Sequence, residues 1–368
     1  MGSSKGLVFV LCMFLVLGLG SAHIGGLEIE YKCKKGNKTT TKDKYLSQVA
    51  LNLEYLEAEY FLWGSVGYGL DKLAPWLVDG GPEPLGVQKA NLDPYYKDIF
   101  YQLGLQEVGH VTIIKKSLGD PPNCAFPRTL LDLSKKNWAK TLDKAFLAKF
   151  GKKLSPPFDP YEDSLKYLIS TYTIPYVGLT GYVGANPMLK GYNAKKLVAG
   201  LLGVESGQDA VIRTELYRWK WKKVHPYHYT VADFTNAIST LRNNLSHAFL
   251  DEGLIVPKEL GSDMKVSGNI LSADKDSLSY GRTPKQLFAT VYGTGDAAKP
   301  GGFYPKGGQG KISEKYLKPE KVEEKEDEDS DDDEESDEES DDESDDESDD
   351  ESDDDSDDDS DDEDEEKN

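Results

Sequence analysis

The fold is decided by residues 106–110, which read QEVGH and place an acid and a histidine three residues apart in an otherwise apolar helical pattern. Residues 53–57 (LEYLE) and 204–208 (VESGQ) insert further acids into two other patterns of helical period. Acids and imidazoles at this spacing project from one face of a helix, and a four-helix bundle can direct them at a metal ion in its core. These stretches predict an all-α bundle with acids inside it.

Apolar periodicity extends the helical prediction to most of the chain. We expect helices over about 44–70, 93–118, 134–150, 193–221 and 230–249, and a kinked or broken helix that starts near residue 161 and meets Pro175. Thr230 and Asp233 form a capping box at the start of the last of these helices. This assigns residues 44–250 to a bundle and residues 251–317, rich in Gly, Pro, Asp and Ser, to a loop-rich extension packed on it.

The candidate metal ligands are Glu57, Glu54, Glu107, His110 and Glu205. Glu57 falls inside the apolar face of its helix, whereas Glu54 lies at the margin of that face. Glu107 and His110 form a complete Glu-x-x-His motif of the kind that binds metals in helical bundles. The motif that begins at Glu205 is incomplete, because an amide at residue 208 replaces the expected imidazole and is a weaker ligand.

The fourth helix contributes no acid, since no Asp or Glu occurs from residue 164 to residue 204. We therefore expect no complete two-metal centre, and at most a single weakly bound iron or manganese ion. The alternative is a metal-free polar core, in which Glu57, Glu107 and Glu205 take up protons or pair with His110. In that case the amide of Gln208 would donate a hydrogen bond to a carboxylate.

Residues 1–22 are predicted to be a secretory signal peptide, because Lys5 precedes an apolar run over 7–19 and small residues follow at 20–22. The run is too short to anchor the chain in a bilayer, and no later stretch approaches the ~20 apolar residues of a membrane span. We therefore expect a secreted protein without a transmembrane anchor, in the secretory lumen, the extracellular space or the cell wall.

A basic arm, residues 23–43, follows the signal peptide. The cysteines that remain after cleavage are Cys33 and Cys124, and an oxidising compartment favours a disulfide between them, although two unpaired thiols are the alternative. Sequons for glycosylation occur at Asn37 and Asn244. Both features agree with secretion.

Residues 318–368 form a tail of Ser, Asp and Glu that cannot bury a core and is expected to be disordered. Residues 326–368 hold 33 of the 66 acidic residues and a net charge of −32, which leaves +9 on residues 1–325 from the total of −23. Such a tail binds hard cations such as Ca²⁺ weakly, or serves only to keep the chain solvated. Its charge also argues against nucleic acid as a partner. Its regularly repeated serines each precede acids and resemble acidophilic-kinase sites: Ser340, Ser344, Ser348, Ser352, Ser356 and Ser360.

Several longer strings resemble the plant desiccation-related proteins of the ferritin-like superfamily. They are LEYLEAE at 53–59, PPFDP at 156–160, IPYVGLTGYVGANP at 174–187 and GVESGQDAVIR at 203–213. The resemblance implies a ferritin-like bundle, a secreted or cell-wall location, accumulation under water deficit and no established catalytic activity. It also implies that Pro175 and Gln208 stand where ligands are expected, which argues against ferroxidase-type activity.

These features favour a secreted, non-catalytic protein of stress or desiccation protection, with a helical scaffold and a hydrated, cation-binding tail. One alternative is a metal-handling ferritin-like protein that binds one iron or manganese ion. Another is an extracellular binder of calcium or a mineral surface that acts through the acidic tail. The expected partners are divalent cations and a cell-wall or matrix surface, and the oligomeric state stays open.

Overall fold

The computed structural model describes residues 40–119, 125–248 and 253–318. The predicted signal peptide, Cys33, Cys124, Asn37 and the tail serines lie outside the described residues. Asn244 is exposed near the C-terminal end of α9 (Val231–Ser246).

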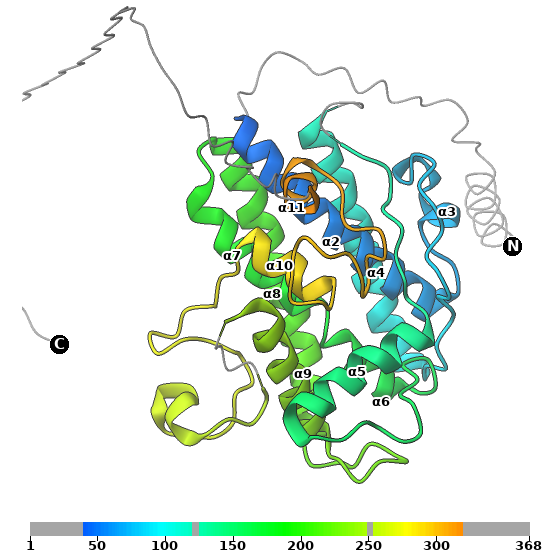
Figure 1. The fold of residues 1–368 in the computed structure, drawn as a ribbon, viewed down its shortest axis with the longest axis vertical. Helices are drawn as coiled ribbons and strands as arrows, with labels where there is room; N and C mark the ends of the chain where they lie inside the picture. Colours follow the sequence, from blue (N-terminus) through cyan, green and yellow to red (C-terminus); the bar gives the residue numbers. More distant parts are fainter. Residues whose placement is uncertain (1–39, 120–124, 249–252, 319–368) are drawn as a thin grey trace, which may run out of the picture. The chain divides into compact units, whose positions relative to one another are not determined.

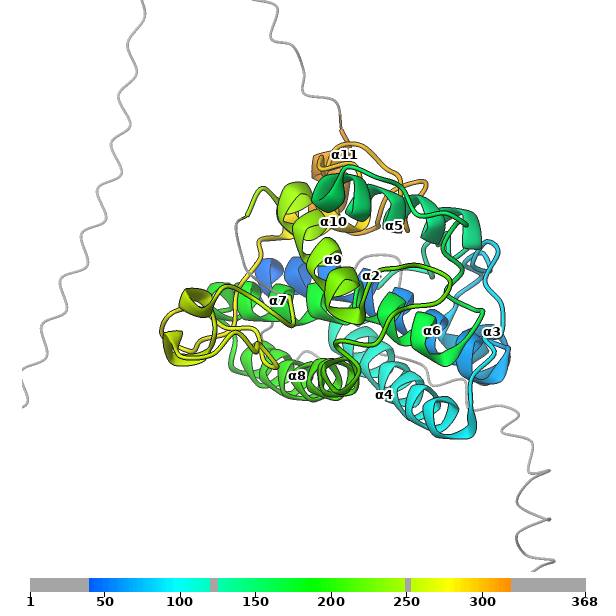
Figure 2. The same ribbon diagram turned by 90° about the horizontal axis from the view of Figure 1, so that it is seen from below.

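Four helical segments form the bundle that contains the candidate site. They are α2 (Thr41–Val66), α4 (Pro94–Leu118), the pair α6 (Ser164–Thr171) and α7 (Pro175–Ala185), and α8 (Tyr192–Arg218). Figure 2 shows α4 and α8 as one layer, α2 with α6 and α7 as the next, and α5 (Lys135–Phe150), α9 and α10 (Pro284–Val291) beyond them. The described residues contain isolated β-bridges but no strand. The prediction of an all-α helical bundle is confirmed.

Local sequence explains where the long helices begin and end. The Thr40 hydroxyl accepts a hydrogen bond from the backbone N of Asp43 (3.2 Å) and caps α2. That helix ends at Gly67, whose φ of 81° is a conformation that glycine adopts without strain. The Asp93 carboxylate caps α4 by accepting from the backbone N of Tyr96 at 3.1 Å.

The helix expected to break at Pro175 is two separate helices, α6 and α7, and Pro175 is the first residue of α7. Proline is tolerated there because the first N–H of a helix has no partner within the helix. A short helix, α3 (Leu70–Leu73), follows α2 after a glycine turn.

The region expected to be loop-rich, residues 251–317, contains two α-helices, α10 and α11 (Lys311–Leu317), and two short 3-10 helices, Lys258–Leu260 and Ser262–Met264. In Figure 1 both lie over the bundle, where α10 packs on α7 and α9, and α11 packs on α2. Asn52 of α2 fastens this region in place: its side chain donates to Gln309 O (2.9 Å) and accepts from Gln309 N (2.8 Å). The extension therefore forms part of the cover over α2.

The central helix α2 is buried around nearly its whole circumference, because α4, α7 and α11 cover it from different sides. Its buried side chains include three glutamates, Glu54, Glu57 and Glu59, each no more than 2% exposed. A division into an apolar and a polar face therefore does not apply to this helix.

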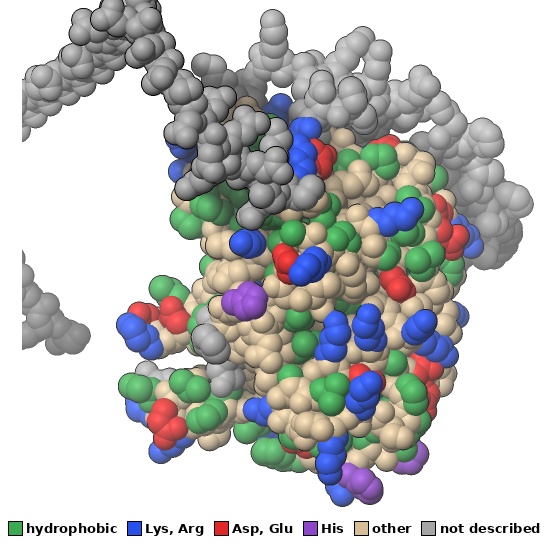
Figure 3. Space-filling view, viewed as in Figure 1, with side chains coloured by type: hydrophobic (Ala, Val, Ile, Leu, Met, Phe, Trp, Pro, Cys, Tyr) green, Lys and Arg blue, Asp and Glu red, His purple; other side chains and the backbone are tan. Residues whose placement is uncertain are grey.

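The surface differs in charge from this interior. Figure 3 shows lysine and arginine side chains spread over the face that α5 forms, and Lys136, Lys140 and Lys149 of that helix are exposed. Within the described ranges, no helix combines the length and apolar character that crossing a membrane requires.

Candidate metal centre

Three helices direct polar side chains at one point in the core of the bundle. Helix α2 supplies Glu54 and Glu57, α4 supplies Glu107 and His110, and α8 supplies Glu205. The spacing of three residues places each pair on one face of its helix. None of the five side chains is more than 7% exposed.

Four of these residues converge closely enough to share an ion. Glu54, Glu107, His110 and Glu205 each offer one ligand atom, and these atoms all lie within 4.8 Å of one another. Nδ1 of His110 is 3.0 Å from Glu54 Oε2, 3.2 Å from Glu107 Oε2 and 3.4 Å from Glu205 Oε1. One nitrogen carries one proton and cannot satisfy three carboxylates, whereas a cation among them can contact all four groups.

Several buried oxygens at the same point have no hydrogen-bond partner among the described residues. They are Oε2 of Glu205, Oε2 of Glu57 and Oε1 of Gln208, whereas Oε1 of Glu205 has only the His110 nitrogen at 3.4 Å. Buried acceptors without partners are costly, and the oxygen and nitrogen donors here are of the kind that iron and manganese bind in helical bundles. The residues present therefore fit a metal ion.

The electrostatics agree with this interpretation. Burial raises the pKa of Glu57 and Glu107 well above the ordinary value, with the neighbouring carboxylates adding to the effect, and it raises the pKa of Glu205 to about 7. Burial also acts on Glu54, but the positive charge of His110 and the hydrogen bond from His110 leave its pKa below the usual range. Without a cation, the acids around His110 have to hold additional protons.

Two further side chains hold the carboxylates in place. The hydroxyl of Tyr182, on α7, donates to Glu54 Oε1. The amide Nε2 of Gln208 donates to Glu107 Oε1 and lies 3.2 Å from Gln106 Oε1. Gln208 thus orients a ligand from the position at which an imidazole was expected. Nothing in the sequence distinguishes Tyr182 from the other tyrosines of apolar stretches, so its place at the centre could not be predicted from the sequence.

Helix α7 approaches the acids through a glycine. A Cβ atom built on Gly178 would lie 2.9 Å from Glu57 Oε1 and 3.6 Å from Glu205 Oε2. Pro175, the residue expected to replace a ligand, begins α7 one turn earlier. The α7 side of the centre therefore has no carboxylate, and a side chain at residue 178 would crowd Glu57.

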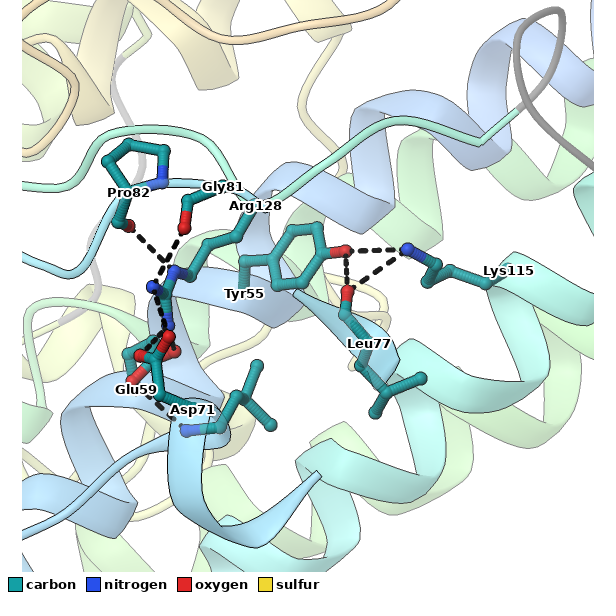
Figure 4. Close-up of polar contacts among 9 residues, drawn as sticks. Tyr55, Glu59, Asp71, Leu77, Gly81, Pro82, Lys115 and Arg128 are labelled. Atoms are coloured by element: carbon teal, nitrogen blue, oxygen red, sulfur yellow. Dashed lines mark hydrogen bonds and ion pairs between the residues drawn. The ribbon is translucent and has the colours of Figure 1, made fainter. Parts of the chain in front are cut away.

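A second group of buried acids lies farther along α2, where Glu59 meets Arg128 (Figure 4). Arg128 donates from Nη1 to Glu59 and Asp71, from Nη2 to Asp71 and to Gly81 O, and from Nε to Pro82 O. All five guanidinium N–H groups are thereby used. Glu59 is therefore paired with a cationic side chain of the same protein.

The sequence profile of the ferritin-like domain matches residues 42–218, a range that contains every candidate ligand. The chain is 50% identical over 282 residues to the ferritin-like catalase Nec2 of Nesocodon mauritianus, covering 76% of this chain and 88% of that protein. It is 51% identical over 270 residues to the desiccation-related protein PCC13-62 of Craterostigma plantagineum, covering 73% and 83%. No solved structure matches.

Two expectations from the sequence are wrong: that the protein is a non-catalytic scaffold, and that it is not an enzyme. They are contradicted by the buried cluster of Glu54, Glu107, His110 and Glu205 and by the 50% identity to a protein named a catalase. The error came from counting ligands against a fixed pattern, in which Pro175 and Gln208 were lost ligands. In the folded chain the four donors that converge include Glu54 in place of Glu57.

Proposed function

Because the chain belongs to the ferritin-like family, we propose that it is a metal-dependent enzyme that dismutates hydrogen peroxide, with iron or manganese as its cofactor. The observation that carries the proposal is the group of four buried donors, Glu54, Glu107, His110 and Glu205, within 4.8 Å of one another. The name of the relative Nec2, a catalase, supports this choice of substrate.

The reaction needs no outside oxidant or reductant. One peroxide loses two electrons and two protons and leaves as dioxygen, and the other takes up two of each and leaves as two water molecules. A bound metal would hold the electrons between the oxidation of one peroxide and the reduction of the other. The remaining tasks belong to the chain.

Those tasks are orientation, exclusion of water and the holding of protons. Tyr182 and Gln208 fix Glu54 and Glu107 by donating to their carboxylates. Burial keeps bulk water from the centre. Glu57, whose pKa burial raises, holds a proton on its carboxyl group close to the space above Gly178. That position suits a group that exchanges protons with a bound peroxide.

The proposal is tested by loading the full chain with iron or manganese, removing loosely held ions with a chelator, and measuring retained metal and oxygen release from peroxide. We expect Glu107→Gln to lose metal and to lower oxygen release by about 10–100-fold, which is typical when groups around a metal are changed. Glu83→Gln, at an exposed position, serves as the matched control and should change neither quantity. Absence of retained metal in the wild type, or an active Glu107→Gln, would overturn the proposal.

A role outside the cell under water deficit is also proposed. It is supported by the similarity to PCC13-62, a desiccation-related protein, and by the N-terminal pattern of a signal peptide. Fractionation of cells that express the full chain would test it, and retention of the protein inside the cytosol would contradict it.

A further inference from the structure

We infer that peroxide reaches the centre through an apolar cavity between α2, α7 and α8, and that Leu287 of α10 limits the size of the molecule that can pass. This inference rests on the proposed function, and it adds a route and a size limit that the ligand cluster alone does not define.

The cavity adjoins the centre directly. Its lining includes Gly178 and Tyr182, the two α7 residues that approach the acids. Gly178 is the position at which a Cβ would crowd Glu57, and Tyr182 donates to Glu54. A molecule at this end of the cavity would therefore lie next to the carboxylates.

The burial of the lining residues shows which end faces the surface. Ala50, Ala185 and Leu197 are partly exposed, whereas Gly178 and Tyr182 are buried. Ala50 lies one helical turn before Glu54 on α2, so the distance from the outer end to the centre is about one to two turns. The cavity thus connects the outside of the bundle with its core.

Its lining restricts what can enter. Among the residues that the structure describes, it contains no Asp, Glu, Lys, Arg or His, and its two hydroxyl groups are already engaged, since Ser47 donates to Asp43 O and Tyr182 donates to Glu54. A charged molecule would lose its hydration here without compensation, whereas an uncharged one would not. The volume of about 20 Å³ exceeds the ~10–15 Å³ needed for one water molecule. The occupant is therefore a small uncharged molecule of the size of hydrogen peroxide.

Leu287 closes one side of this route. A Cβ built on Gly181 would lie 2.8 Å from Cδ1 of Leu287, so this leucine fills the space left by a glycine of α7. Helix α10 lies beyond residues 42–218, the part that matches the ferritin-like domain. The size limit is therefore a property of the C-terminal extension and not of the bundle.

The first test compares hydrogen peroxide with tert-butyl hydroperoxide as substrates of the metal-loaded full chain. We expect Leu287→Ala to raise the ratio of kcat/KM for the larger peroxide to that for the smaller one by roughly 10-fold, the effect that removal of a few methyl groups has on a pocket. The matched control is Leu142→Ala, which truncates a fully buried leucine of α5 away from the cavity and should leave the ratio unchanged. An unchanged ratio in Leu287→Ala would overturn the size limit.

The second test does not depend on catalysis. Nitric oxide is an uncharged diatomic that binds ferrous iron, and its association rate with the iron-loaded protein can be followed by stopped-flow absorbance. We expect Ala50→Phe, at the outer end of the cavity, to slow this rate by about 10-fold at unchanged iron content, while Ala148→Phe, exposed on α5, leaves it unchanged. An unchanged rate in Ala50→Phe would overturn the route.

The two proposals fail in different ways. If the wild type retains no metal, the proposed function and the route both fall. A wild type that retains metal and releases oxygen from peroxide supports the proposed function. If the kcat/KM ratio is then unchanged in Leu287→Ala and the nitric oxide association rate is unchanged in Ala50→Phe, only the proposed route is wrong. Should Leu287→Ala not fold, Ala50→Phe still decides the route.

Discussion

Helix α2 carries two groups of buried acids that are neutralised in different ways. Glu59 meets Arg128, whose guanidinium cannot lose its proton and also contacts Asp71 (Figure 4). Two and five residues earlier, Glu57 and Glu54 belong to a group of four carboxylates for which His110 is the one nearby cationic side chain among the described residues. The first group is complete within the chain, whereas the second is deficient in positive charge.

This difference contrasts an ion pair that is balanced within the chain with a cluster that fits a metal ion. Removing one partner of a buried ion pair leaves an uncompensated charge, so the Glu59 group stabilises the fold only while both partners are present. The four carboxylates around His110 lack a matching positive charge, and this imbalance brings no evident benefit to the fold. Such departures are typical of functional sites, where the missing charge arrives with a cofactor.

The largest effect is expected at Arg128. Arg128→Met leaves Glu59 buried without its cation and five hydrogen bonds unmade, and should lower the free energy of unfolding by about 3–5 kcal/mol. Denaturant unfolding monitored by circular dichroism measures this. The double variant Arg128→Met/Glu59→Gln should recover part of the loss. A small effect of Arg128→Met would mean that the two groups do not differ as described.

A smaller effect is expected from pH, and it should distinguish metal-free from metal-loaded protein. Glu205, whose pKa burial raises from 4.5 to about 7, keeps its proton in the folded chain at a pH where the unfolded chain releases it. Its contribution to stability is therefore present below about pH 4.5 and is lost as the pH rises through 7. Burial lowers the pKa of His110, but its carboxylate partners raise it by more. The contribution of His110 to stability is therefore also lost as the pH rises above 6.5, the ordinary pKa of histidine.

We therefore expect the free energy of unfolding of the metal-free protein to fall between pH 5 and pH 8. A bound metal replaces the protons, so metal affinity should rise with pH and the loaded protein should lose the part of this decline that Glu205 and His110 contribute. Chemical unfolding at several pH values with and without metal measures both slopes. Because burial raises the pKa of Glu59 to about 7 in either form, its contribution should persist in the loaded protein and serves as the internal control. Identical slopes in the two forms would contradict the assignment of the centre.

The smallest effect is expected from two matched tyrosine substitutions. Tyr182→Phe removes a hydrogen bond to Glu54, and Tyr55→Phe removes one to Leu77 O (2.6 Å) beside the Arg128 group. Each should cost about 1–2 kcal/mol of unfolding free energy in the metal-free protein. Metal loading should reduce the cost of Tyr182→Phe, because the ion neutralises Glu54, and should not alter that of Tyr55→Phe. Thermal unfolding of the four combinations decides this, and an equal response to metal in both variants would count against the comparison.

The features that the sequence predicts correctly depend on residues close together in the chain. The pairing of Glu107 with His110 follows from their spacing, because residues three apart lie on one helix face whatever surrounds them. The capping box at Thr230 and the break at Pro175 likewise depend on neighbouring residues and occur as expected. The helical class of the fold follows from such local signals, repeated along the chain.

Contacts between distant residues decided the rest. Glu54 and Glu57 could not be ranked from the pattern of α2, since that helix is buried on all sides once α4, α7 and α11 surround it. The contacts of Tyr182 with Glu54, 128 residues apart, and of Arg128 with Glu59, 69 residues apart, leave no periodic signal. Local sequence therefore sets the long helices and places Glu107, His110 and Glu205 on their inward faces. Folding sets which buried acids meet a cationic side chain, as Glu59 meets Arg128, and which remain short of positive charge, as around His110, because packing brings together side chains that are distant in the sequence.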